Sequence, residues 1–205
     1  MTHRSGGQEE RRAQIIEAAL SCFARRGYAN TTMDDIAAEA GVSKGTLYWY
    51  FEGKDDLLMA TLTSVFEGIG EEAMVAVASC ETAADKLRTL ASAMIRISRE
   101  APWFFNLFIE FWAQSPRREE AGQAWAEILA RYAHAIGEIV EGGVERGEFR
   151  PVDGYSLAWA LLAAYDGLSA YISICPDLDA EQVSETFIET VVQGLRGEAM
   201  DARGR

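Results

Sequence analysis

The chain has 205 residues, of which 49% are hydrophobic, so it can bury the core of one moderate domain or of a small domain joined to a larger one. It has only four prolines, and Val, Ile and Thr do not alternate with polar residues as they do in strands, which indicates an all-α protein. Three widely spaced cysteines without metal-ligand spacing indicate reduced thiols in a cytoplasmic protein, and they predict no metal site and no cofactor.

The net charge of −13 at first disfavours nucleic acid as a partner, but the charge is unevenly distributed. Residues 1–58 carry −2 and residues 59–205 carry −11. The N-terminal part can therefore present a local basic face to DNA. The apolar run 155–175 has the length of a membrane span, but Asp166 at its middle costs about 2.5–3.5 kcal/mol on insertion. A helix packed on other helices is expected there, without membrane contact.

The predicted elements begin with a disordered segment, 1–8, and a first helix, 9–26, which Gly27 ends. Thr32 opens a second, short helix through a capping box with Asp35. Ser43 caps a third helix over 44–51, and a long fourth helix begins at Lys54 and reaches about residue 80. Five further helices are predicted at 83–99, 102–114, 118–146, 154–174 and 180–196, and residues 201–205 are expected to be disordered.

The second and third helices, over about 32–51, form a helix-turn-helix motif with Gly41 in the turn. Leu47 and Phe51 anchor the third helix, which leaves its other positions free to face outward. Lys44 stands at a helix start, where an acid would be favoured, and this indicates an anionic partner. The alternatives are a plain solvated Lys44, partial core packing of Tyr48, and packing of Trp49 under the first helix.

The stretch 31–51, followed by Lys54 and by Leu57 and Leu58, resembles the signature of the TetR family of transcriptional regulators. The resemblance covers roughly residues 9–60. It implies a DNA-binding domain over 9–58, an effector-binding and dimerisation domain over 59–200, and contacts with bases or phosphates from the outward residues of the motif. These are Thr32, Ser43, Lys44, Gly45, Thr46, Tyr48, Trp49, Tyr50 and Lys54. Tyr50 stands where the family often has histidine, so an altered sequence preference is expected.

The second half of the chain contains an aromatic cluster that is either a core stripe or the lining of a cavity for a ligand. The resemblance implies an effector pocket there. Its candidate lining is Phe104, Phe108, Phe111, Trp112, Trp125, Tyr132 and Asp166.

Small and apolar residues in the last two helices predict a dimer seam, in which two helices from each subunit form a four-helix bundle. The candidate residues are Ala160, Ala163, Ala164, Gly167, Leu168, Tyr171, Phe187, Val191 and Leu195. A two-fold dimer would place two recognition helices about 34–36 Å apart, on a palindromic operator.

The sequence thus predicts a homodimeric repressor whose partners are operator DNA, itself and a small apolar or amphipathic effector that releases it from DNA. The alternative is a helical carrier or sensor that binds a hydrophobic molecule and no DNA. Catalysis is not expected, because neither His3 nor His134 has a nucleophile or an acid pair near it in the sequence.

Overall fold

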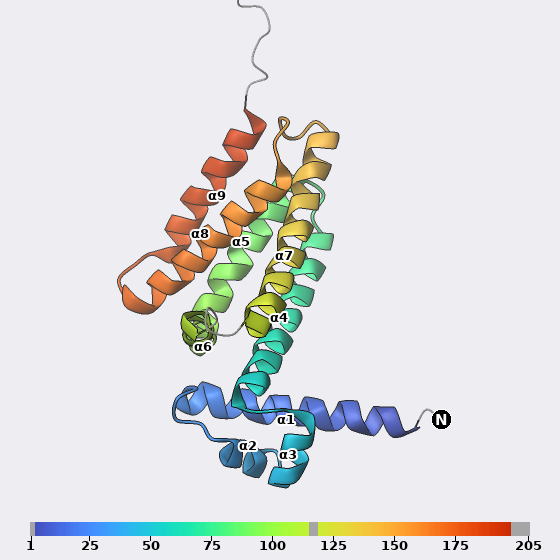
Figure 1. Ribbon diagram of the computed structural model, residues 1–205. Coiled ribbons are helices and arrows are strands. Elements are labelled where there is room, and N and C mark those ends of the chain that lie inside the picture. The colour runs from blue at the N-terminus through green and yellow to red at the C-terminus, as the bar shows by residue number, and fades with distance from the viewer. Residues whose placement is uncertain (1–2, 115–118, 198–205) are drawn as a thin grey trace, which may run out of the picture. The chain divides into compact units, whose positions relative to one another are not determined.

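The computed structural model describes residues 3–114 and 119–197, and within these residues it contains helices and no strand (Figure 1). This confirms the all-α fold class. The helices are α1 (His3–Arg26), α2 (Met33–Glu39), α3 (Lys44–Tyr50), α4 (Lys54–Ala78), α5 (Ala83–Glu100), α6 (Pro102–Gln114), α7 (Glu119–Glu145), α8 (Gly154–Ile174) and α9 (Ala180–Arg196).

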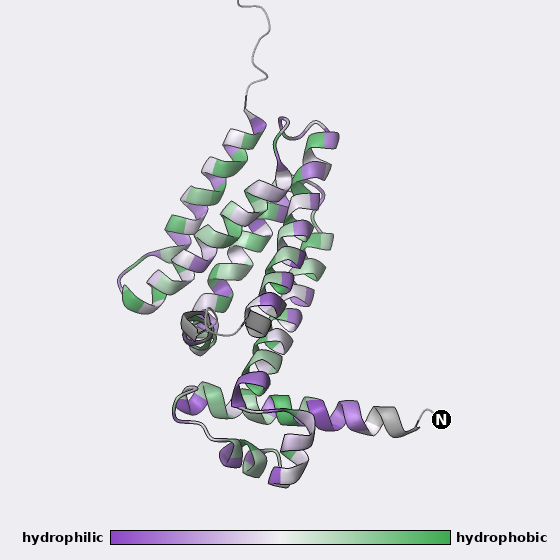
Figure 2. Ribbon diagram, viewed as in Figure 1, coloured by the Kyte–Doolittle hydropathy of each residue, from purple (hydrophilic) through white to green (hydrophobic). Residues whose placement is uncertain are grey.

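Most helices begin and end within two residues of the predicted bounds, and the exception is the start of α1. This helix begins at His3, so residues 3–8 are helical and the expected disorder is a wrong prediction for them. The physical reason is that a helix nucleus anchored by buried Ile15 and Ile16 extends at one hydrogen bond per added residue, even where the added residues are polar. Figure 2 shows hydrophilic colour over the first coloured turns of α1 and hydrophobic colour farther along the helix. Residues 201–205 lie outside the described residues.

The chain divides into two compact units, and the divisions fall inside helices rather than in linkers. The first unit comprises Met1–Gly70 with Asn106–Ala121, and the second comprises Glu71–Phe105 with Gly122–Arg205. Helices α4, α6 and α7 therefore contribute to each unit. The sequence-based domain division at residues 58 and 59 stays a prediction.

The first unit has a small core made from one face of each of its N-terminal helices. Ile15 of α1, Ile36 of α2 and Leu47 of α3 have no exposed surface. Gly27 and Gly41 have φ angles of 73° and 62°, so they end α1 and shape the turn after α2 in a region of backbone space that favours glycine. The predicted capping box at Thr32 is present and fixes the start of α2.

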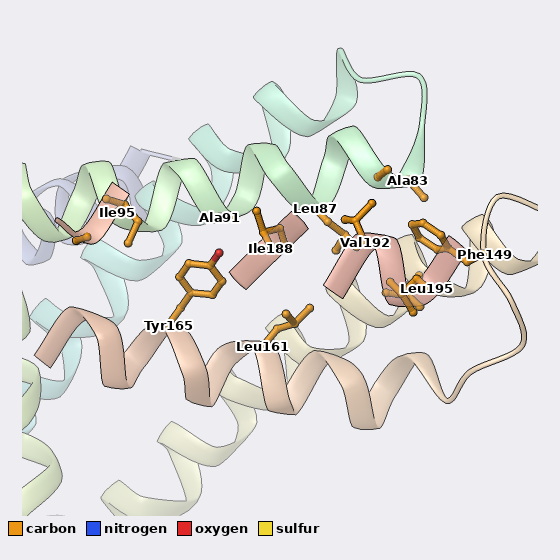
Figure 3. Close-up of a cluster of buried hydrophobic side chains, with 13 residues drawn as sticks. Ala83, Leu87, Ala91, Ile95, Phe149, Leu161, Tyr165, Ile188, Val192 and Leu195 are labelled. Atoms are coloured by element: carbon orange, nitrogen blue, oxygen red, sulfur yellow. The ribbon is translucent and has the colours of Figure 1, made fainter. Parts of the chain in front are cut away.

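The second unit has its core where α5, α8 and α9 pack together, with Phe149 at one end (Figure 3). Apolar side chains such as Leu87, Leu161 and Val192 point toward one another in this cluster. Buried hydroxyl groups tie the same helices together. The oxygens of Ser98 and Ser169 lie 2.8 Å apart, and those of Tyr165 and Ser184 lie 3.0 Å apart.

Helix α8 is apolar, but much of it is not buried within the protomer. It is long and apolar enough to cross a membrane by length and composition alone, and 22% of its most apolar window is buried. At its C-terminal end the exposed fractions of Tyr171 and Ile174 are 57% and 70%. The expected packing of α8 on other helices therefore holds for one face, and the other face is open in the protomer.

Two adjacent glycines of α7 give a test of the packing around Phe149. A Cβ atom on Gly143 would lie 2.4 Å from the ring of Phe149 and 2.8 Å from the Cβ of Ala83, whereas one on Gly142 would meet only the flexible end of Arg146, at 3.2 Å. We expect Gly143→Ala to lower the free energy of unfolding by about 1–3 kcal/mol. Gly142→Ala should raise it by a few tenths to about 1 kcal/mol, because alanine favours helix. Urea denaturation followed by circular dichroism measures both, and equal effects of the two variants would contradict the packing.

Candidate DNA-binding site

The third helix, α3, is fixed at both ends and along its inner face. Its N-cap, Ser43, accepts a hydrogen bond from the backbone N–H of Thr46 at 3.0 Å, and the hydroxyls of the two residues lie 2.8 Å apart. Leu47 and Phe51 are 0% and 2% exposed, so the predicted core role of both is confirmed. The outer face of α3 is thereby held in one orientation by packing on its inner face.

The aromatic residues of α3 point outward. Tyr48 is 48% exposed and Trp49 is 65% exposed, and the ring of half-buried Tyr50 meets that of Trp49 edge-on, with the centroids 4.6 Å apart. The alternative that Trp49 packs under the first helix is therefore wrong. Exposed indole and phenol groups supply both apolar contact surface and hydrogen-bond donors.

Lys44 at the start of α3 is exposed but ion-paired. Its Nζ lies 2.7 Å from Oδ1 and 3.0 Å from Oδ2 of Asp34, in the first turn of α2. This hydrogen bond raises the pKa of Lys44 above its ordinary value. The lysine is therefore not simply solvated, and its charge is balanced within the protein.

Lys54 is half-buried and is bound by the protein itself. Its Nζ donates to the carbonyl oxygens of Tyr28 at 2.8 Å and Thr31 at 2.9 Å, and it lies 4.1 Å from the centroid of the Tyr28 ring. These contacts fix the start of α4 against the segment between α1 and α2. The phosphate contact implied for Lys54 stays a prediction, and it would use the third ammonium hydrogen.

Comparison with known proteins agrees with this arrangement. The family model for bacterial regulatory proteins of the tetR family matches residues 15–61, and the model for the C-terminal part of BetI-type transcriptional repressors matches residues 83–196. The chain belongs to the TetR family of transcriptional regulators. It is thus a DNA-binding regulator and not an enzyme, and the alternative of a carrier that binds no DNA is set aside.

Among curated relatives, the transcriptional regulator TtgR of Pseudomonas putida is 52% identical over 59 residues, which are 29% of this chain and 28% of that protein. BetI of Brucella anthropi is 25% identical over 187 residues, covering 87% of this chain and 96% of BetI.

Three solved structures share the fold. A TetR regulator from Haloarcula marismortui superimposes with a TM-score of 0.80 at 21% identity, covering 91% of this chain and 98% of that chain. FadR from Bacillus subtilis in complex with stearoyl-CoA has a TM-score of 0.69 at 24% identity, covering 89% of this chain and 98% of that chain. A regulator from Saccharomonospora viridis in complex with choline has a TM-score of 0.75 at 23% identity, covering 90% of this chain and 96% of that chain.

The residues predicted to line an effector pocket are distributed over both compact units. Phe108, in the first unit, is buried and its ring centroid lies 5.8 Å from that of Phe66. Phe104 and Trp125, in the second unit, are 1% and 2% exposed, and Tyr132 and Asp166 are half-buried. The side chains of Phe111 and Trp112 lie outside the described residues. The assignment of these residues to a pocket stays a prediction.

Asp166 is an ionisable group in the apolar helix α8, and no hydrogen bond or ion pair to it is found among the described residues. Burial raises the pKa of its carboxyl from 3.8 to about 6. The charged form is therefore disfavoured, as expected for a carboxyl group that is withdrawn from water without a partner.

The residues predicted for the dimer seam divide into two groups. Ala160, Ala163 and Tyr171 are exposed in the protomer, and the backbone of Gly167 has open space beside it. Leu168, Phe187 and Val191 pack partly on the α5–α8–α9 core, and Ala164 is half-buried. Leu195 is 3% exposed inside that core, so in the protomer it packs on its own neighbours, and its assignment to the seam stays a prediction. Its side chain faces the protomer's own core because α9 turns this position toward its neighbours.

Sequence reasoning missed a groove between α5 and α9, with a volume of about 530 Å³. Its floor includes Ile95 and Ile188, and its rim is charged. Arg88 is bound to Glu189 by two hydrogen bonds of 2.5 and 2.9 Å, and Arg99 is paired with Glu181. None of the predicted effector residues lines this groove. Arg88 and Glu189 are 101 positions apart, so no local pattern could have indicated the pair.

The raised pKa of Asp166 predicts how stability changes with pH. Between about pH 4 and pH 6 the unfolded state loses its proton first, so the folded state is progressively penalised as the pH rises, by up to about 3 kcal/mol above pH 6. We expect Asp166→Asn to raise the free energy of unfolding by about 1–3 kcal/mol at pH 8 and to have less effect at pH 5. Denaturant titrations across this range measure it. Asp177→Asn, at an exposed position, is the control, and the same pH dependence in both variants would contradict the prediction.

Proposed function

We propose that this regulator is a homodimeric, cytoplasmic repressor that binds a palindromic operator through α3 and is released by a small apolar or amphipathic effector. The observation that carries the proposal is the outer face of α3, where exposed Tyr48 and Trp49 stand beside Ser43, Lys44 and Thr46 on a helix anchored from behind. Hydroxyl and ammonium groups can bond phosphates and base edges, and an α-helix fits the major groove.

The open face of α8 supports the dimer. Small residues such as Ala160 and Ala163 allow another helix to approach closely, and exposed Tyr171 and Ile174 provide apolar surface to bury. A self-complementary apolar face of this kind suits a two-fold interface. Such a dimer presents two copies of α3 to DNA, which is the reason for expecting a palindromic operator.

The effector part of the proposal is supported by the aromatic composition of α6 and by two solved relatives. The Bacillus subtilis FadR structure contains stearoyl-CoA and the Saccharomonospora viridis structure contains choline, so regulators of this fold bind both a long acyl chain and a quaternary ammonium. Helix α4 is continuous from the end of the DNA-binding motif at Lys54 into the second unit. An effector that binds more tightly when α4 is in a position unsuited to DNA would shift the population away from the DNA-binding state.

The DNA-binding role is tested by selecting operators from random DNA and then measuring the affinity of variants for the recovered site. We expect two half-sites about one helical turn apart. Trp49→Ala should weaken operator binding at least tenfold and leave the melting temperature unchanged, because this side chain is 65% exposed. Val75→Ala, at a position 74% exposed on α4, is the control. Unchanged operator affinity in Trp49→Ala would show that this face of α3 does not contact DNA. A ligand that saturates the protein and leaves operator affinity unchanged would contradict the proposed coupling between effector binding and DNA release.

The dimer face is tested by placing a charge on it. Ala163→Glu should convert the dimer to a monomer in analytical ultracentrifugation, because each subunit would bury a carboxylate in the proposed interface, and operator affinity should fall with it. The helical circular dichroism signal should be retained, since Ala163 is exposed in the protomer. Ala126→Glu, on an exposed position of α7, should leave the assembly intact. A dimer that survives Ala163→Glu would exclude this face.

A further inference from the structure

The DNA-binding head, residues 9–58, contains arginine and lysine side chains. Each of those that the structure describes already contacts a partner within the protein. Arg25 pairs with Glu39 at 2.8 Å, Arg26 with Asp35 at 2.7 Å and Lys44 with Asp34 at 2.7 Å. Arg11 donates to Gln14, Arg12 lies over the ring of Phe51 and Lys54 donates to two carbonyl oxygens. Three positive side chains that could bind DNA phosphates are thus neutralised by acidic residues of α2.

Among these pairs, the one between Asp34 and Lys44 lies on the surface assigned to DNA. The side chain of Asp34 is 67% exposed, and that of Lys44 is 58% exposed. The capping box uses the neighbouring Asp35, so the N-cap of α2 does not depend on the carboxylate of Asp34. The two oxygens of Asp34 hold the ammonium group at 2.7 and 3.0 Å, so this group already has the anionic oxygen partners that a phosphate would otherwise supply.

We propose that Asp34 is an internal substitute for a DNA phosphate, which holds Lys44 until α3 docks on the operator and so restrains binding to DNA of other sequences. The inference rests on the proposed role of α3 as the recognition helix. It assigns to Asp34 an indirect effect on DNA affinity without any contact to a base.

The physical basis is the difference between the two kinds of binding. Binding to DNA of arbitrary sequence comes almost entirely from phosphate neutralisation and the release of counterions. A lysine balanced by a carboxylate 2.7 Å away contributes little to that term. On the operator, base contacts made by the rest of α3 add free energy that arbitrary sequences do not supply, and this offsets the loss of the internal pair.

The experiment compares Asp34→Asn with the unaltered protein on a duplex of about 30 base pairs of random sequence and on the selected operator, by fluorescence anisotropy over a series of salt concentrations. We expect random-sequence binding to tighten about three- to tenfold, which corresponds to one surface ion pair in each head of the dimer. The salt dependence should steepen by about 0.9 in logarithmic slope for each head. Operator binding should tighten by at least as large a factor, because docking of α3 breaks the same internal pair there.

Two matched variants separate this effect from a general change of charge. Glu17→Gln removes the same charge from an exposed position of α1 and should tighten binding much less. Lys44→Gln should abolish the gain when it is combined with Asp34→Asn, because the gain requires a freed ammonium group. A gain that persists in the double variant, or that Glu17→Gln matches, would overturn the role of Asp34.

A measurement without DNA keeps this inference distinct from the proposed function. Because Asp34 raises the pKa of Lys44, NMR titration of the ammonium group should show a lower pKa in Asp34→Asn. An unchanged value would overturn the internal pair. Failure of the unaltered protein to prefer any selected operator would instead overturn the proposed function.

Discussion

The DNA-binding surface depends on how a seven-residue helix is held in place. Isolated helices shorter than about 12–15 residues are only marginally stable in water, so α3 exists because its surroundings fix it. Leu47 and Phe51 anchor it from behind, and the backbone N–H of Val42 donates to the carbonyl of Ala37 at 3.0 Å across the turn. Lys54 then binds the start of α4 to the segment before α2. With these contacts made, outer positions such as those of Tyr48 and Trp49 are not needed for core packing and can be aromatic.

The second constraint is electrostatic, because an acidic protein has to bind a polyanion. The net charge of residues 1–58 is only −2, whereas the rest of the chain carries −11. The cations of this part are paired with neighbouring groups. A surface of this kind has a weak general attraction for DNA and relies on groups that form directional contacts, such as the hydroxyls of Ser43 and Thr46. Weak general attraction is an advantage for a regulator, since arbitrary sequences greatly outnumber operators.

Much of the fold could be predicted from the sequence because its signals are local. The capping box at Thr32 and the glycines at 27 and 41 mark helix ends through interactions that span a few residues. The contacts of Lys54 with residues 23 and 26 positions earlier could not be predicted in this way, because they depend on tertiary packing. Helical periodicity likewise placed Phe187 and Leu195 in one apolar set, but it could not show that the core of the same protomer covers Leu195.

Helix α8 combines two requirements that act on opposite faces. Tyr165 and Ser169 face the core and are satisfied by hydroxyl hydrogen bonds, so this face fixes α8 against α5 and α9. Asp166 follows Tyr165 directly, and at neutral pH its ionised carboxyl opposes its own burial. A cation or a proton donor that reached this carboxyl would offset the cost of its burial. We therefore expect Asp166 to be a point at which ligand chemistry can be converted into a preference between conformations, because a ligand shifts an equilibrium only through such a difference in affinity.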